Sequence, residues 1–332
     1  MEPQYQARFS PEILAEAARR YGAAAGAMQE LDGFESFIYA YSRAGAERIL
    51  RIGHSHRRPE RLVQGEAEWL RYLHRSGCDR VAMPIESLAG NLTEAVADGS
   101  GEHFIATAFE KAPGRHLQQS DYSPVLFETW GALLGRIHAL SAEYRPRWPR
   151  PHWDDPQMID APNRLPPSED RVRARYQELR AHLDQLPRSD PRHYGMIHQD
   201  AHAGNFFILP QADGAVQITL FDFDDCCYAW YAYDVAMVLF YVVIGQPDPA
   251  AFAREFLRHF LRGYRREQAF SAEWLAELPN FLKLREIDLY AEIHRSFDVT
   301  NLTHPWVKRY MDGRKERLEA GVPYLAIDFT AA

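Results

Sequence analysis

Three side chains with oxygen donors, Asp200, Asn205 and Asp222, lie close together along the chain. Carboxylate and amide oxygens are hard ligands that suit Mg²⁺, which keeps several waters and usually shares the phosphates of a substrate. A carboxylate that does not bind the metal can accept a proton from a hydroxyl nucleophile. Together they would supply the parts that phosphoryl transfer to an alcohol requires, a metal site and a base.

The residues between these side chains predict the element that brings them together. Two short apolar, β-prone runs, 206–209 and 216–221, flank Asp213-Gly214, which is a strong hairpin turn signal. In an antiparallel hairpin the start of the first strand lies beside the end of the second. We therefore expect Asn205 to lie next to Asp222, with the third side chain on the tight loop that leads in.

This spacing matches the catalytic loop of protein kinases, which reads H-R-D-x-x-x-x-N and is followed by D-F-G. The stretch His198-Gln199-Asp200 followed by Asn205 reproduces the loop, with Gln in place of Arg. Asp222-Phe223-Asp224 reproduces the metal motif, with Asp in place of Gly. In this arrangement Asp200 is the catalytic base, and Asn205 and Asp222 hold the metal ion.

The signature His198-x-Asp200-x-His202-x-x-Asn205, followed by Asp-Phe-Asp, resembles the aminoglycoside phosphotransferase and choline kinase-like superfamily. Its members commonly carry His-Gly-Asp-x-His-x-x-Asn and then Asp-Phe-Asp or Asp-Phe-Glu. The resemblance implies an α+β, bilobal protein-kinase-like fold, with a small antiparallel β lobe that contains a helix and a larger, mainly helical lobe. It also implies ATP and Mg²⁺ as cofactors and a small-molecule hydroxyl as the acceptor.

The expected boundary between the lobes is the break at 110–114, which reads Glu-Lys-Ala-Pro-Gly. We predict a nucleotide-binding lobe over 1–111 and a catalytic and acceptor-binding lobe over 112–332. In the resembled superfamily, backbone groups at this hinge meet the adenine edge, which places Glu110 beside the nucleotide.

The first lobe contains a predicted hairpin over 31–52, with Gly33 near its start, followed by an amphipathic helix over 61–75. By the resemblance, the hairpin covers the nucleotide phosphates and Arg51 on its second strand grips them. Glu66 on the helix would pair with Arg51 and fix its direction. Arg replaces the Lys of protein kinases here, but a guanidinium can also bind phosphate oxygens through two hydrogen bonds.

Further elements follow from capping and periodicity. Ser10 before Pro11 is typical of a helix start, a polar, glycine-containing turn is expected over 91–101, and a strand over 103–109. The expected helices are 11–21, 130–140, 169–186, 235–244, 252–268 and 274–297. The stretch 145–167, rich in Pro and Trp, is either a connecting loop or a lid.

Two residues are given structural roles in the larger lobe, since Asp234 matches a family Asp that braces the catalytic loop and His198 opens that loop. Acidic and aromatic side chains after the metal motif suggest a cationic acceptor, bound by ion pairs and cation–π contacts. The candidate acceptor-binding residues are Asp224, Asp225, Tyr228, Glu286 and Tyr290. Amino alcohols, choline-like molecules, homoserine-like amino acids and aminoglycosides all fit.

Two alternative functions use the same residues. His198 and His202, with Asp200 and Asp222, could form the zinc site of a hydrolase, since imidazole suits zinc. The chain could also be a non-catalytic module that binds nucleotide, although the retained Asp200 argues against this.

Composition limits the remaining classes. The chain has 332 residues, 46% hydrophobic and 25% charged, as expected of a soluble globular protein with room for two lobes. A formal charge of −8 argues against non-specific nucleic-acid binding. The three cysteines are too few for a disulfide framework, and neither a signal sequence nor a membrane-spanning segment is recognised. We expect a cytoplasmic enzyme, and the sequence does not indicate its oligomeric state.

Overall fold

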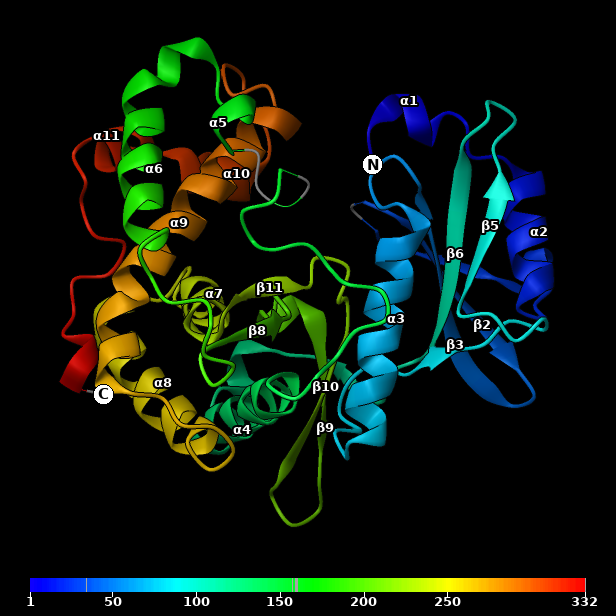
Figure 1. Cartoon of the computed structure of the whole chain (residues 1–332), viewed down its shortest axis with the longest axis horizontal. Helices are drawn as coiled ribbons and strands as arrows, with labels where there is room; N and C mark the ends of the chain where they lie inside the picture. The colour runs from blue at the N-terminus through cyan, green and yellow to red at the C-terminus, as the bar shows by residue number, and fades with distance from the viewer. Residues whose placement is uncertain (34, 157, 159–160, 332) are drawn as a thin grey trace. The chain divides into compact units, whose positions relative to one another are not determined.

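The computed structural model describes residues 1–33, 35–156, 158 and 161–331 (Figure 1). Contacts divide the chain into two compact units. The first unit contains residues 1–116, 144–150 and 206–224, and the second contains 117–143, 151–205 and 225–332.

The first unit is built on antiparallel β-structure with two main helices. Its helices are α1 (Pro3–Gln6), α2 (Pro11–Arg20), the short η1 (Ala25–Ala27) and α3 (Glu60–Arg75). Its main sheet contains β1 (Gln29–Leu31), β2 (Phe37–Arg43), β3 (Ala46–His54), β4 (Pro84–Ile85), β5 (Thr93–Ala97) and β6 (His103–Glu110). The strand order is β1-β2-β3-β6-β4, and β5 also pairs with β6.

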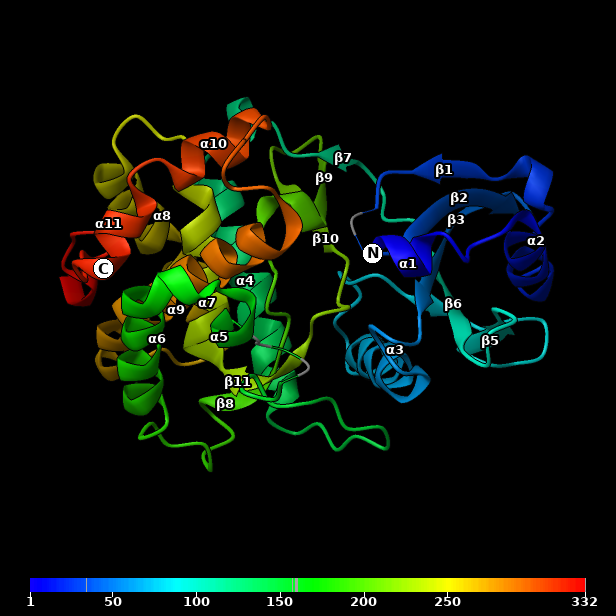
Figure 2. The same cartoon turned by 90° about the horizontal axis from the view of Figure 1, so that it is seen from above.

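The alternation of side chains along β3 explains how the sheet carries a functional residue. Leu50 and Ile52 point into the hydrophobic core that α2 shares with β2, β5 and β6. Arg51, one residue out of phase, points to the opposite face, where Glu66 of α3 receives it. Figure 1 shows α3 lengthwise beside the sheet, and Figure 2 shows the same helix almost end-on.

A hairpin from the middle of the sequence also belongs to the first unit. β9 (Phe206–Pro210) pairs with β10 (Val216–Leu220) in antiparallel register, and β9 also pairs with β7 (Arg115–His116). Leu220 exchanges backbone hydrogen bonds with Arg80 and Ala82 just after α3. These bonds belong to the first unit, which contains residues 206–224, whereas the sequence placed the hairpin within 112–332.

The second unit is mainly helical. Its α-helices are α4 (Pro124–Ser141), α5 (Ala161–Arg164), α6 (Asp170–Leu183), α7 (Tyr231–Val242), α8 (Pro249–Tyr264), α9 (Ala272–Ser296), α10 (Pro305–Met311) and α11 (Arg314–Glu319). Short helical turns are η2 (Gln119–Asp121), η3 (Pro167–Glu169), η4 (Ala203–Asn205) and η5 (Phe329–Ala331). β8 (Tyr194–Ile197) and β11 (Cys227–Trp230) form a two-stranded antiparallel sheet.

Close helix packing forms the core of this unit. α4 lies against α8 at a crossing where Gly131 and Gly263 allow the backbones to meet, since a Cβ on either would come within 1.9 Å of a carbonyl oxygen of the other helix. α7 is buried along almost its whole length and packs against α9. In the part of the chain that the structure describes, no helix combines the length and apolar character needed to cross a bilayer.

Most predicted elements are present, with shifts of a few residues at their ends. One expectation was wrong, because the stretch 91–101 contains β5 in addition to its turns. The run Thr93–Ala97 has modest β-propensity, but its pairing with β6 makes it a strand. The stretch 145–167 is shared between the two units, and its residues 157 and 159–160 lie outside the described residues.

Candidate active site

The predicted catalytic loop, 198–205, follows β8, and its first two residues are hydrogen-bonded to Asp234 of α7. One carboxylate oxygen of Asp234 accepts the backbone N–H of His198 at 2.8 Å and the other accepts that of Gln199 at 2.7 Å. Nε2 of His138 on α4 lies 3.1 Å from the same carboxylate. All four residues are buried, so the geometry gives Asp234 the bracing position that the sequence predicted.

Gln199 adopts a backbone conformation that normally requires glycine. Its φ is +68°, in the left-handed region, which explains why related motifs read His-Gly-Asp. The buried side chain forms a compensating contact, because its Oε1 accepts a hydrogen bond from Sγ of Cys227 at 2.6 Å. The strained turn directs the next residue, Asp200, away from the brace.

The two carboxylate oxygens of Asp200 have different surroundings. Oδ2 accepts a hydrogen bond from Nδ2 of Asn205 at 2.9 Å and lies 3.4 Å from Nε2 of His202. Nδ1 of His202 accepts the backbone N–H of Gly204 at 2.9 Å, which leaves the ring proton on Nε2, facing Asp200. Oδ1 is buried and has no hydrogen-bond partner, which suits an atom that receives a proton from a ligand.

A cation on α9 completes the surroundings of Asp200. Nη2 of Arg285 lies 3.8 Å from the unpaired Oδ1. Burial by itself raises the pKa of Asp200, but its interactions with His202 and Arg285 outweigh burial and hold the pKa below its ordinary value, against a smaller opposing effect of Asp225. The carboxylate is therefore ionised at neutral pH. Sequence analysis did not single out Arg285; the signal was its i,i+3 spacing from Asp288, to which it binds.

Asn205 is oriented by its own amide nitrogen. Nδ2 donates to the backbone oxygen of Asp200 at 2.8 Å as well as to its Oδ2. The side-chain oxygen of Asn205 therefore takes no part in the contact with Asp200. Asn205 directly precedes β9, and Asp222 is the second residue after β10. The register of the hairpin pairs Phe206 with Leu220.

The first unit carries the residues predicted for the nucleotide phosphates. Arg51 donates to Glu66 through two parallel hydrogen bonds, of 2.9 Å from Nη1 and 2.5 Å from Nη2, which confirms the predicted pairing. Nη1 also lies 3.8 Å from Oδ1 of Asp222. Asp222 has a φ of +64° and a side chain that is 55% exposed, so the metal motif, like the catalytic loop, contains a residue in the left-handed region.

Asp224, predicted to bind the acceptor, lies among arginines instead. Its carboxylate forms ion pairs with Arg57 and Arg58, and Nη2 of Arg150 donates to its backbone oxygen at 2.6 Å. The side chain is almost fully buried. These contacts hold the end of the metal motif against the start of α3.

Two other predicted acceptor residues are engaged within the helical unit. Glu286 is fully buried and paired with Lys283 and, at 2.5 Å, with Arg314 of α11. Tyr290 is also buried and donates its hydroxyl to Glu169 at 3.0 Å. Both residues link α9 to neighbouring segments, and we do not include them in the acceptor site proposed below.

The remaining predicted residues occupy the expected elements. Asp225, two residues before β11, and Tyr228, the second residue of β11, are both half-buried. Gly33 lies in the turn between β1 and β2, where an added Cβ would come within 2.2 Å of the Ser36 carbonyl oxygen. Glu110 ends β6, and its backbone N–H is bonded to the carbonyl of Met83 at 2.8 Å.

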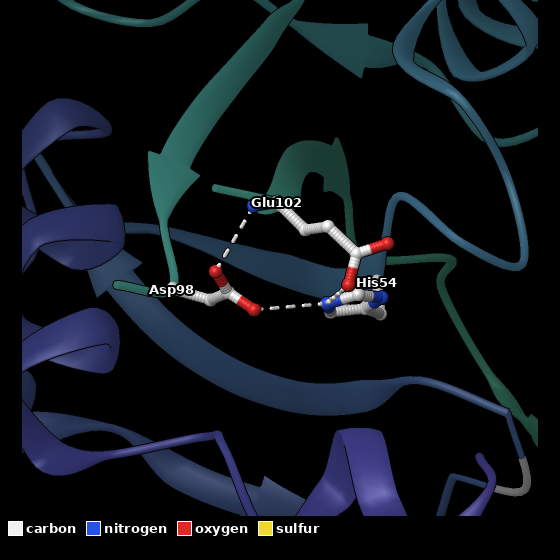
Figure 3. A group of neighbouring side chains, drawn as sticks. All are labelled: His54, Asp98 and Glu102. Carbon is white, nitrogen blue, oxygen red and sulfur yellow. Dashed lines mark hydrogen bonds and ion pairs between the residues drawn. The ribbon is translucent and has the colours of Figure 1, made fainter. Parts of the chain in front are cut away.

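The zinc alternative finds no support among the described residues. There, the group of His, Cys, Asp and Glu side chains close enough to share a metal ion is His54, Asp98 and Glu102, and it includes neither catalytic-loop histidine. Figure 3 shows Asp98 and Glu102 converging on His54. Nη1 of Arg8 lies 3.1 Å from Asp98 and 2.6 Å from Glu102, so this cluster already has a cation from the chain itself.

Comparison with known proteins agrees with this geometry. Residues 28–270 match the model of the phosphotransferase enzyme family that includes aminoglycoside phosphotransferases. Amicoumacin kinase of Bacillus subtilis (strain 168) is 36% identical over 327 residues, which cover 96% of this chain and 95% of that protein. The chain belongs to the phosphotransferase enzyme family.

Solved structures show the same fold. The amicoumacin kinase hAmiN, in complex with AMP-PNP, Ca²⁺ and Ami, has a TM-score of 0.93 and 33% identity, with 100% of this chain and 99% of that chain covered. The microcompartment-associated aminopropanol kinase follows at a TM-score of 0.74 and 22% identity, covering 94% of this chain and 98% of that one. The predicted kinase-like fold is confirmed, and this family member is a small-molecule phosphotransferase that acts on hydroxyl groups.

Proposed function

We propose that the enzyme transfers the γ-phosphoryl group of ATP, with Mg²⁺, to a hydroxyl of a small molecule that carries an amine. The observation that carries this proposal is the asymmetry of Asp200, in which one oxygen is fixed by Asn205 and His202 while the other is buried and unpaired. A general base needs this arrangement, with a defined direction and an open lone pair.

The chemical step follows from that asymmetry. The acceptor hydroxyl donates its hydrogen bond to Oδ1 of Asp200, and the carboxylate takes the proton as the hydroxyl oxygen bonds to the γ-phosphorus. The bond between that phosphorus and the oxygen bridging to the β-phosphate breaks, and ADP leaves with the bonding electrons. Asp200 then returns the proton to solvent. Positioning and charge stabilisation supply most of the rate in such reactions.

The donor set fits a magnesium ion. The amide oxygen of Asn205 and the half-exposed carboxylate of Asp222 are hard ligands, few enough to leave positions for water and phosphate oxygens. When bound, the ion would neutralise charge that develops on the phosphates. Arg51, fixed by Glu66, and the hairpin that contains Gly33 are proposed to contact the phosphates, and the backbone near Glu110 to contact the adenine edge.

Two observations support the proposed identity of the acceptor. The relatives that are 33% and 36% identical over nearly the whole chain are both amicoumacin kinases, so amicoumacin is the first acceptor to test. Asp225 and Tyr228 near the catalytic loop are the candidate contacts for a cationic group.

The test is an ADP-release assay with Mg²⁺ over amicoumacin, amino alcohols, amino acids, aminoglycosides and neutral sugars. We expect turnover with amicoumacin or another amine-bearing alcohol. Asp200→Asn should lower kcat by about 10²- to 10⁴-fold and leave ATP binding intact, with Asp213→Asn in the hairpin turn as the matched control.

Three results would contradict the proposal in different ways. Full activity of the Asp200→Asn variant would remove Asp200 from the role of base. Turnover of neutral sugars alone would remove the cationic acceptor. Stabilisation by ATP without turnover of any acceptor would favour the nucleotide-binding module.

A further inference from the structure

Asp200 is faced by a guanidinium that the catalytic motif does not contain. The protein-kinase loop has an arginine beside its catalytic Asp, and this chain has Gln199 at that position. The positive charge near Asp200 comes instead from Arg285, contributed by α9, a helix far along the chain. The inference developed here rests on the proposed function, in which Asp200 is the base.

Arg285 is held in place by partners on two helices. Nη1 donates to Oδ2 of the buried Asp288 at 2.8 Å, one turn along α9. Nη2 donates to the hydroxyl of Tyr241 on α7, and the ring of Tyr241 in turn lies 4.5 Å from that of His202. The guanidinium, which is 17% exposed, therefore has little freedom to move away from the loop.

The contact with Asp200 is directional. Oδ2 is already engaged by Asn205 and His202, whereas Oδ1, the atom without a hydrogen-bond partner, is the one 3.8 Å from Nη2 of Arg285. At this distance the guanidinium attracts the oxygen without forming a hydrogen bond with it. The guanidinium of Arg285 thus favours one orientation of Oδ1, while the lone pair of Oδ1 stays available to accept a hydrogen bond.

Arg285 also has an unused donor. Its Nε is buried and without a hydrogen-bond partner. A buried arginine whose role was only structural would be expected to satisfy all its donors, because an unpaired buried donor is unfavourable. The ion pair of Asp200 and Arg285 therefore contains one unpaired acceptor, Oδ1, and one unpaired donor, Nε.

We propose that Arg285 is the positioning residue of the catalytic base, and that it fixes Oδ1 of Asp200 toward the acceptor hydroxyl from a helix outside the catalytic motif. It has no proton to exchange in the reaction, since a guanidinium stays charged at any working pH. Its contribution is orientation and a fixed positive charge, which support catalysis only if they are present before the substrate reacts.

The experiment compares Arg285→Met, which removes the charge at similar length, with Arg285→Lys, which keeps it. We expect Arg285→Met to lower kcat by about 10- to 100-fold with the KM for ATP unchanged, and Arg285→Lys to recover part of the loss. Arg295→Met, on the same helix and paired with Glu292, is the matched control and should keep the parent kcat.

A second variant covers the case in which Arg285→Met leaves Asp288 buried and unpaired and the protein fails to fold. The double variant Arg285→Met with Asp288→Asn removes both charges, and we expect it to fold and to show the same loss of kcat. If Arg285 acts through Asp200, Arg285→Met should cause no further loss in the Asp200→Asn background.

The outcomes separate this inference from the proposed function. A kcat equal to that of the parent in both Arg285 variants, or the same fractional loss with and without Asp200, would overturn the positioning role while the kinase assignment stands. A parent protein that releases no ADP with any acceptor, or an Asp200→Asn variant with full activity, would overturn the proposed function itself.

Discussion

Gln199 shows how a single residue can depart from a motif and still keep its geometry. Its φ of +68° is the value that glycine supplies freely and other residues adopt at a disadvantage. We predict that Gln199→Gly is more stable than Gln199→Ala by about 1 kcal/mol, since both lose the contact with Cys227 and only Ala retains the strain. Urea unfolding measures the difference.

The neighbouring Ala201 provides the control for this prediction. It is buried and does not have a positive φ, so Ala201→Gly should reduce stability, which is the opposite sign. Equal stabilities of the two Gln199 variants would mean that the loop relaxes out of the left-handed conformation when the side chain is shortened.

At the scale of elements, His138 joins three helices of the second unit. Its ring, on α4, contacts Asp234 of α7 at 3.1 Å and the Tyr264 hydroxyl at the end of α8 at 2.8 Å. Burial lowers the pKa of His138 more than the neighbouring Asp234 raises it. The pKa of His138 in the unfolded chain is near 6.5, and its pKa in the folded protein therefore lies below that value.

This shift predicts a pH dependence of stability. The unfolded chain binds the proton first, so the stabilisation is fully present above about pH 6.5 and is lost as the pH falls toward the folded pKa. The free energy of unfolding should decline more steeply on acidification in the parent than in His138→Asn. Parallel pH profiles of the two proteins would show that His138 is not the group responsible.

Another element-scale contact distinguishes two roles for Glu286. Because its buried carboxylate pairs with Lys283 and Arg314, Glu286→Gln leaves two cations without their partner. We expect a loss of about 3 kcal/mol in the free energy of unfolding with no change in the KM for the acceptor. Glu277 lies on the same helix as Glu286 and forms a more accessible pair with His182 of α6. The variant Glu277→Gln should therefore lose less than about 1 kcal/mol.

The opposite result for Glu286 would revive its predicted role. A raised KM for the acceptor with unchanged stability would place Glu286 in the acceptor site, as the sequence suggested. The sequence-based argument relied on the spacing of Glu286 and Tyr290 along one helix face, and spacing alone does not reveal which side chains α11 and η3 supply as partners.

The same reasoning explains what could be predicted from the sequence. The loop and the hairpin depend on local spacing and turn signals, and they were predicted from the residues, whereas the Arg51–Glu66 pair was predicted from the resemblance to the superfamily. The role of Arg285 depends on a partner distant in the chain, the catalytic loop, so no local motif indicated it. Asp224 belongs to the same kind, because its arginine partners Arg57, Arg58 and Arg150 all precede it by many residues. β5 was missed for another reason, because its own propensity is modest and its pairing with the neighbouring β6 makes it a strand.

For the molecule as a whole, the proposed metal site predicts how the enzyme responds to chelation. Asn205 and Asp222 are too few ligands to hold Mg²⁺ without the nucleotide. We expect dialysis against EDTA to abolish ADP release, addition of Mg²⁺ to restore it, and the unfolding temperature without nucleotide to stay the same. Purified protein that retains stoichiometric zinc, or that unfolds at a lower temperature after EDTA, would favour a resident metal instead.

The order in which segments join the first unit has a consequence for synthesis. Because residues 206–224 complete a unit whose other strands lie before residue 117, the ribosome releases the early strands long before their last partner emerges. The exposed edge of β7 and the β4 region must stay unpaired during that interval. Splitting the gene between residues 117 and 205 would likewise separate the hairpin from β7, with which β9 pairs, so a reporter built by fragment complementation would have to keep the hairpin with the N-terminal piece.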